Sequence, residues 1–261
     1  MTIVNPSFDP ANALSVATSL ATTMLRGGLG VATHPCPVQP KLPLELYEFE
    51  GCPYCRIVRE ALTELDLDAS IFPCPKGGVR FRPRVVELGG KAQFPFLVDP
   101  NTGRRLYESA DIVRYLFETY GQRELPLHWR LPGLQQLGSG IAGLPRLGAG
   151  SRARPSRAPA HALELYSFES SPFARPVREL LCELEIPYTL RSVGRSTPSD
   201  WVPPALRDML SIHPEPATNN RRQLLRRAKR ISIPYLVDPN TGTELAESTE
   251  IIDYLKTTYA L

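Results

Sequence analysis

The 261-residue sequence has no apolar run long enough to cross a membrane, for which a helix needs about 20 such residues. It also lacks a basic N-terminal segment followed by an apolar core, which argues against a secretory signal. The first residues are poor in acids and rich in Ser, Thr and Ala, but only Arg26 supplies basic charge there, so they resemble an organelle transit peptide faintly. We therefore expect a cytoplasmic protein that binds no membrane, with an organelle as the alternative if the source is eukaryotic.

Cysteine is scarce as well. Five cysteines, an odd number spread thinly, do not form the disulfide framework of a small secreted domain, so a reducing compartment is expected. The sequence has neither a second Cys-x-x-Cys pair nor paired histidines, the ligand patterns of zinc sites, and we expect no metal. The net charge of +3 is too small to indicate nucleic-acid binding by itself.

The most informative stretch is residues 52–55, Cys-Pro-Tyr-Cys. Residues 44–49 before it alternate apolar and charged side chains, as a half-buried strand does. Residues 56–67 after it carry apolar side chains at helical spacing. The first cysteine is therefore expected at or just before a helix N-terminus.

A helix start favours the thiolate of Cys52, because unpaired N–H groups and the positive end of the helix dipole face it. Arg56 and Arg59 add positive charge nearby. We predict that Cys52 has the lowest thiol pKa in the chain and attacks disulfides, and that Cys55 resolves the mixed disulfide. A structural disulfide is the alternative, although such short loops are usually redox-active.

The chain repeats itself, because four blocks of sequence return in the same order. Residues 44–50, 52–56, 94–103 and 108–112 return as 163–169, 171–175, 233–242 and 247–251. The offset is 119 for the first two blocks and 139 for the last two, so the second copy carries about 20 extra residues in its middle. A period this long indicates duplicated domains. The arms before the copies, residues 26–30 and 146–150, match loosely.

Each copy is expected to read strand, helix, variable middle, strand, turn, strand, helix. Ser109 and Ser248 suit the N-cap positions of the closing helices. A helix is also predicted before each copy, over residues 11–25 and roughly 133–142. The apolar face of the first contains Leu14, Ala17, Ala21 and Leu25, and we expect it to pack on the domain. A partner-binding or dimer helix is the alternative, and a homodimer is compatible with the sequence.

The order of elements, with Cys-Pro-Tyr-Cys at residues 52–55, resembles the glutaredoxin branch of the thioredoxin fold. The Glu-Ser pair at residues 108–109 resembles the glutathione-binding N-terminal domain of glutathione transferases (GST). As a whole the chain is similar to a family of tandem proteins with two such domains and no helical GST C-terminal domain. The resemblance implies an α/β fold of two thioredoxin-like lobes, each with its own mixed sheet of about four strands. The expected domains are an N-terminal arm with an amphipathic helix (1–43), a first thioredoxin-like domain with the cysteine pair (44–120), a helical and Pro/Gly-rich linker (121–162), and a second thioredoxin-like domain without the cysteines (163–261).

The resemblance also implies a site for glutathione in each copy. In the first copy Pro95 should be cis, the backbone of Phe94 should pair with the cysteinyl part, and Glu108 and Ser109 should hold the γ-glutamyl end, where a helix N-terminus attracts the carboxylate. The corresponding residues of a possible second site are Ile233, Pro234, Glu247 and Ser248. Plain helix capping is the alternative for the Glu-Ser pairs.

The second copy has lost both thiols, because Cys52 and Cys55 are replaced by Ser171 and Ala174. It therefore cannot carry out thiol–disulfide exchange. The turn at Ser171 resembles the serine motif of some glutathione transferases, whose hydroxyl hydrogen-bonds the glutathione thiolate. A degenerate structural partner is the interpretation we favour slightly.

Three functions remain open at this point. The favoured one is a glutathione-linked thiol–disulfide oxidoreductase that works through the first copy, with glutathione as cosubstrate. The others are a glutathione transferase acting on electrophiles and a non-catalytic scaffold that binds glutathione or a partner. The sequence does not reveal the physiological substrate, the oligomeric state, the organism, or the roles of Cys36, Cys74 and the basic stretch 221–230. The commonest meaning of such a stretch is a solvated helix face, and an anion, RNA or acidic-partner site is the alternative.

Overall fold

The structure is a computed structural model that describes residues 10–202, 206, 209 and 216–261. The first half contains α1 (Pro10–Leu25), β1 (Leu44–Glu48), α2 (Pro53–Leu65), β2 (Ala69–Pro73), α3 (Arg82–Gly89), β3 (Phe96–Asp99), β4 (Arg104–Tyr107) and α4 (Ser109–Leu116). The connecting segment contains α5 (Pro132–Gly143), flanked by the short helical turns η1 (Phe117–Gly121), η2 (Leu127–Trp129) and η3 (Leu144–Arg146). The second half contains β5 (Leu163–Ser167), α6 (Ala174–Glu183), β6 (Tyr188–Ser192), η4 (Pro198–Trp201), α8 (Asn219–Ala228), β7 (Tyr235–Asp238), β8 (Thr243–Leu245) and α9 (Ser248–Tyr259). The order of strands and helices predicted for each copy is confirmed.

The strands of the described residues form one eight-stranded mixed sheet in the order β4-β3-β1-β2-β6-β5-β7-β8. The expectation of two separate sheets is therefore wrong. Each copy does contribute four neighbouring strands, but β2 and β6 pair antiparallel at the centre, with Ser70 opposite Thr189. These two residues are matching positions of the two copies, so an approximate two-fold axis passes between them. Pairing satisfies the backbone groups that each four-stranded half would otherwise expose at its edge.

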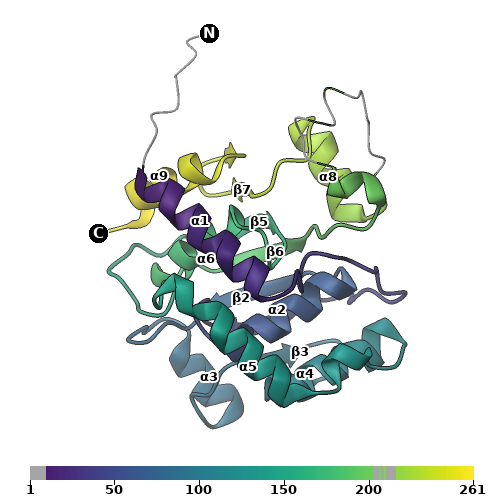
Figure 1. Ribbon diagram of the computed structural model, residues 1–261. Helices are drawn as coiled ribbons and strands as arrows, with labels where there is room; N and C mark the ends of the chain where they lie inside the picture. The colour runs from purple at the N-terminus through teal and green to yellow at the C-terminus, as the bar shows by residue number, and fades with distance from the viewer. Residues whose placement is uncertain (1–9, 203–205, 207–208, 210–215) are drawn as a thin grey trace.

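The helices cover the sheet on both faces (Figure 1). Residues of α2, α4, α6 and α9 share a single hydrophobic core that runs across both copies. Two smaller clusters lie on the other face, one with Val85 of α3 and one with Leu224 of α8. Because side chains alternate along a strand, Leu46 of β1 enters the large core while Tyr47 enters the cluster of α3.

The helices of the two arms cross over. Helix α1 precedes the first copy, yet Thr23 donates a hydrogen bond to the carbonyl of Ser170 in the second copy at 2.9 Å. Helix α5 precedes the second copy, yet Ser139 donates to the carbonyl of Pro53 in the first copy at 2.7 Å. Each arm therefore covers the strand-to-helix turn of the other copy.

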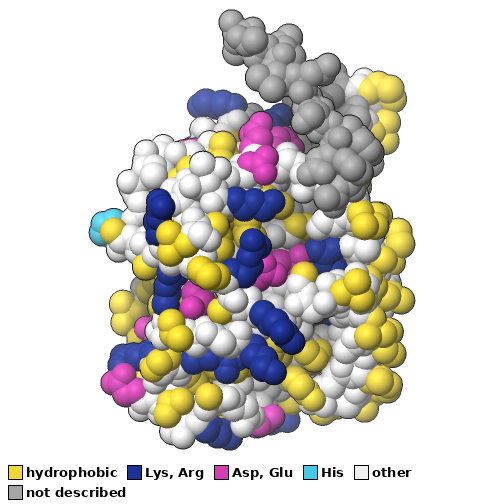
Figure 2. All heavy atoms as spheres, turned by 90° about the vertical axis from the view of Figure 1, so that its left-hand side faces the viewer, with side chains coloured by type: hydrophobic (Ala, Val, Ile, Leu, Met, Phe, Trp, Pro, Cys, Tyr) yellow, Lys and Arg dark blue, Asp and Glu magenta, His cyan; other side chains and the backbone are white. Residues whose placement is uncertain are grey.

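The predicted packing face of α1 is wrong. Leu14 is 66% exposed, whereas Ser19 and Thr22 are completely buried. The helix packs through small polar side chains that hydrogen-bond to the neighbouring arm and to the second copy. Apolar side chains of α1 and α5 are left exposed along one edge of the molecule (Figure 2).

Buried arginines and glutamates join the two halves between α2 and α6. Arg59 of α2 donates to Glu169 of the second copy at 2.8 Å, and Arg178 of α6 donates to Glu50 of the first copy at 2.9 Å. The approximate two-fold axis relates the two contacts, because Arg178 matches Arg59 and Glu169 matches Glu50 at the repeat offset of 119. All four side chains are at most 2% exposed, so the sequence-distant halves depend on each other for charge balance.

Candidate functional site

The Cys-Pro-Tyr-Cys turn lies where the sequence predicts it, between β1 and α2. Cys52 is the N-cap residue of α2, Pro53 is the first residue of the helix, and the backbone N–H of Cys55 donates to Cys52 Sγ at 3.3 Å. Both cysteines are reduced and buried, with exposed fractions of 3% and 0%.

Cys52 is the one cysteine of the five whose pKa lies below its ordinary value. The largest cause of the lowered pKa is a hydrogen bond from the Cys55 thiol. Backbone N–H groups and the charge of Arg59 lower the pKa further, and together these effects outweigh burial, which raises it. Burial raises the pKa of Cys55 well above its ordinary value, and the pKa of Cys36 to about 11. The predicted ranking of the thiols agrees with this geometry, although the Arg56 side chain points away to α5.

Cys74 and Cys182 are also buried, and burial raises the pKa of both thiols. Cys182 lies on α6. We assign no chemical role to either.

Glu48 is a residue that the sequence analysis missed. It ends β1, is 1% exposed, and accepts a hydrogen bond from Arg59. Burial raises the pKa of Glu48 to about 8, and its charge in turn opposes ionisation of Cys55. The signal in the sequence is that the matching residue of the thiol-free copy is Ser167, so the acid and the thiols are lost together.

The predicted glutathione residues of the first copy lie at the same end of the sheet as Cys52. Strands β1 and β3 are antiparallel, so the residues after β1 lie beside those before β3, and the rings of Phe49 and Phe94 are 6.1 Å apart. The Phe94–Pro95 peptide bond is cis, as predicted. Strand β4 pairs with β3 and delivers residues 108–109 to this same end.

Ser109 is buried, with 3% of its surface exposed, and the Glu108 carboxylate accepts a hydrogen bond from Gln93. Within the part of the chain that the structure describes, neither the backbone of Phe94 nor the hydroxyl of Ser109 makes a hydrogen bond. Glu108, not Ser109, is the N-cap residue of α4, and it gives no side-chain cap, so the capping expectation for Ser109 is wrong. Glu108 has φ of 63°, a backbone conformation that is uncommon for a residue other than glycine.

The second copy keeps the arrangement of these residues but differs in detail. Ser171 Oγ accepts from the N–H of Ala174 at 3.2 Å, and the Ile233–Pro234 peptide bond is cis, as predicted. Glu247, which is the N-cap residue of α9 in place of the expected Ser248, has an ordinary φ of −104°. Its carboxylate forms an exposed ion pair with Arg230 at 3.2 Å.

Part of the basic stretch 221–230 serves the fold. Arg221 of α8 is buried and donates to Asp200 at 2.7 Å, and Arg227 forms a partly exposed ion pair with Glu244 at 2.8 Å. Among the described residues, no cluster of three or more His, Cys, Asp or Glu side chains could hold a metal ion. Within the same part of the chain, every helix is too short or too polar to cross a membrane.

Comparison with known proteins decides the family. A model of the glutathione S-transferase N-terminal domain matches residues 46–124 and 165–261, which together make up more than half of the chain. The chain belongs to this family. The resemblance drawn from its sequence is confirmed, and a glutathione-related function follows from it.

Two solved structures are similar to part of the chain. A delta-class glutathione transferase of Nilaparvata lugens is 31% identical over 31% of this chain and 38% of its own, with a TM-score of 0.27. A Bombyx mori glutathione transferase is 26% identical over 33% of this chain and 39% of its own, also with a TM-score of 0.27. The chain thus spans less than two fifths of either transferase. No curated protein matches it.

Proposed function

We propose that the protein is a glutathione-linked thiol–disulfide oxidoreductase that works through its first copy. The supporting observation is the lowered pKa of Cys52 at the same end of the sheet as the Phe94–Pro95 bond and residues 108–109. A thiol that ionises readily beside a glutathione groove is what this reaction requires.

The Cys52 thiolate attacks one sulfur of the substrate disulfide. A bond forms between Cys52 and that sulfur, the substrate S–S bond breaks, and the departing thiolate takes up a proton. Thiols of glutathione then reduce the mixed disulfide. For each substrate disulfide, two glutathione molecules become one glutathione disulfide.

Glutathione is the better candidate for this second step than Cys55. Burial holds the pKa of Cys55 well above its ordinary value, so little of its thiolate exists at neutral pH. In our proposal Cys55 instead donates its S–H to Cys52 and helps to lower the pKa of that thiol.

A glutathione transferase is the second candidate. It is favoured by the family and by Ser171, which matches Cys52 in the repeat and whose hydroxyl accepts the same N–H contact, although α6 begins only at Ala174. The ordinary backbone of Glu247 and its ion pair with Arg230 favour the interpretation of the second copy as a structural partner.

The deciding experiment measures two reactions on the same preparations. Glutathione-dependent disulfide reduction and conjugation of an aryl halide are assayed for the native protein, Cys52→Ser and Ser171→Ala. The oxidoreductase proposal expects Cys52→Ser to abolish reduction and Ser171→Ala to leave it intact. Conjugation that is lost in Ser171→Ala alone would support the transferase. Absence of both activities from the native protein would instead favour a binding scaffold.

A further inference from the structure

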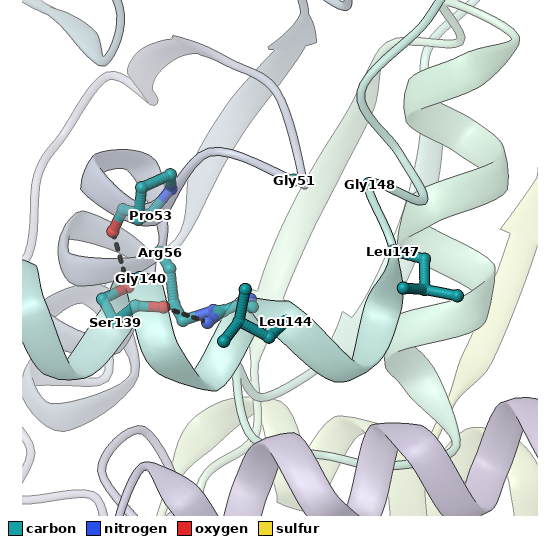
Figure 3. Close-up of a pocket in the computed structure, with 9 residues that line it drawn as sticks. Gly51, Pro53, Arg56, Ser139, Gly140, Leu144, Leu147 and Gly148 are labelled. Atoms are coloured by element: carbon teal, nitrogen blue, oxygen red, sulfur yellow. Dashed lines mark hydrogen bonds between the residues drawn. The ribbon is translucent and has the colours of Figure 1, made fainter.

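A cavity of about 310 Å³ lies between α5 and the Cys-Pro-Tyr-Cys turn (Figure 3). Its lining residues are Gly51, Pro53, Arg56, Ser139, Gly140, Gly143, Leu144, Leu147 and Gly148. Gly51 and Pro53 are the neighbours of Cys52 in the chain. The cavity is thus beside the redox turn and is distinct from the groove of residues 94–95 and 108–109.

The charged group of this cavity is only partly bonded. Arg56 is 3% exposed, and its Nη1 donates to the carbonyl of Ser139 at 2.8 Å. Among the described residues, Nε is buried without a hydrogen bond and forms an ion pair with Glu169 at 3.6 Å, while Nη2 is not buried in this way and makes no hydrogen bond. Figure 3 shows the guanidinium lying against α5 between Ser139 and Leu144. A buried guanidinium with unused donors is costly unless a further acceptor binds to it.

The matching residue of the second copy, Arg175, uses all of its side-chain nitrogens as hydrogen-bond donors. Arg175 donates through Nε to Ser19 at 3.2 Å, and through Nη1 and Nη2 to the carboxylate and carbonyl of Glu169, both at 3.3 Å. All three of its nitrogens are therefore bonded. The copy that kept the thiols is the one whose arginine retains free donors.

The space beside Arg56 results from a difference between the two arm helices. Ser139 of α5 corresponds to Ser19 of α1, so Gly143 corresponds to Thr23. Thr23 spans the gap to the turn of the second copy through its bond to Ser170. Gly143 leaves that gap open in the first copy, where a Cβ would lie 3.8 Å from Arg56 Nη2.

The buried ion network between the two halves contains more positive than negative side chains. Four buried arginines of α2 and α6 meet three buried glutamates, and these residues are Arg56, Arg59, Arg175, Arg178, Glu48, Glu50 and Glu169. With every glutamate ionised, one positive charge is still not balanced within this group. Arg56, with the fewest bonds, is the member that faces the cavity.

We propose that this cavity binds a small organic anion with an apolar body. The carboxylate or sulfonate group of such a ligand accepts a hydrogen bond from Arg56, and the apolar part lies against Pro53 and Leu144. Binding depends only on the cavity. The further consequence, that disulfide substrates with an acidic group are preferred, rests on the proposed function, because it requires Cys52 to react with the bound molecule.

The test uses calorimetric titration of the full chain carrying Cys52→Ser, so that its result does not depend on redox activity. The probes are naphthalene-1-acetate, the uncharged 2-(1-naphthyl)ethanol, and acetate. We expect naphthalene-1-acetate to bind, and each of the other probes to bind at least about tenfold more weakly. The alcohol lacks the carboxylate, and acetate lacks the apolar rings. Equal binding of the uncharged probe, or of acetate, would overturn the proposal.

Two variants and a control locate the site. Arg56→Met should weaken binding of naphthalene-1-acetate about tenfold or more, since it removes a charged donor. Gly143→Thr should abolish binding by filling the gap as Thr23 does. Its Cβ would make only an ordinary contact with Arg56, so no charge of the ion network is removed, and threonine is tolerated in a helix at least as well as glycine. Gly133→Thr, on the same helix where a Cβ meets open space, should leave binding unchanged. Unaltered binding in Gly143→Thr would refute the assignment even if Arg56→Met fails to fold.

Discussion

Replacing Glu169 by glutamine tests whether the ion network holds the two halves together. The carboxylate is completely buried within the protein and accepts hydrogen bonds from Arg59 at 2.8 Å, Arg178 at 2.9 Å and Arg175 at 3.3 Å. Burial by itself would raise the pKa of Glu169, but the charges of these three arginines hold it well below its ordinary value. Glutamine keeps the shape of the side chain and removes its charge.

The expected loss in the free energy of unfolding is about 3–5 kcal/mol, the usual cost of leaving buried charges without their partner. This is a large part of the roughly 5–15 kcal/mol that stabilises a typical protein. Urea unfolding at pH 7, followed by circular dichroism and by the fluorescence of Trp129 and Trp201, measures the loss. Glu87→Gln is the matched control, because Glu87 belongs to an exposed ion pair and its loss should change little. A loss below about 1 kcal/mol for Glu169→Gln would refute the reasoning.

The same variant has a defined dependence on pH. Because the pKa of Glu169 is lower in the folded state than in the unfolded chain, the stabilisation is complete above the unfolded value of about 4.5. It is lost as the pH falls below that value toward the depressed pKa of the folded state. The difference in stability between the native protein and Glu169→Gln should therefore shrink in acid. If the stability difference between the native protein and Glu169→Gln instead grew below about pH 4, the lowered pKa of Glu169 would be contradicted.

Three further predictions concern the first copy. Alkylation rates measured against pH should place the pKa of Cys52 below the ~8.5 of a free thiol, and faster alkylation of another cysteine at neutral pH would contradict this. Cys55→Ser should retain disulfide reduction when glutathione is in excess, with a fall of about tenfold or less because the Cys55 S–H no longer assists ionisation, whereas Cys52→Ser should have no activity. Burial raises the pKa of Glu48 to about 8 in the folded state, so its contribution to stability is fully present below about pH 4.5 and is lost as the pH rises to about 8. As the pH is raised from about 6 to 9, the free energy of unfolding should therefore fall less for Glu48→Gln than for the native protein in parallel urea titrations. Equal falls would count against a raised pKa of Glu48.

The sequence by itself determined the local elements and the reactive turn. The strand before residues 52–55 and the helix after them have opposite periodicities, so their junction and the position of Cys52 at a helix start can be read directly. The repeated blocks likewise established two copies with the same order of elements. The cis bonds at Pro95 and Pro234 followed from the family resemblance carried by those blocks.

Only the tertiary structure decided how the copies meet. Strand β2 pairs with β6 through backbone groups, which every sequence provides, so the side chains of β2 do not indicate that the two halves share one sheet. Helix α1 was assigned the wrong face because hydrophobic periodicity does not register small polar side chains that pack by hydrogen bonding, as Ser19 and Thr22 do. The unused donors of Arg56 depend on Glu169 and on α5, which are distant in the chain, and such charge balance arises only when the fold brings these segments together.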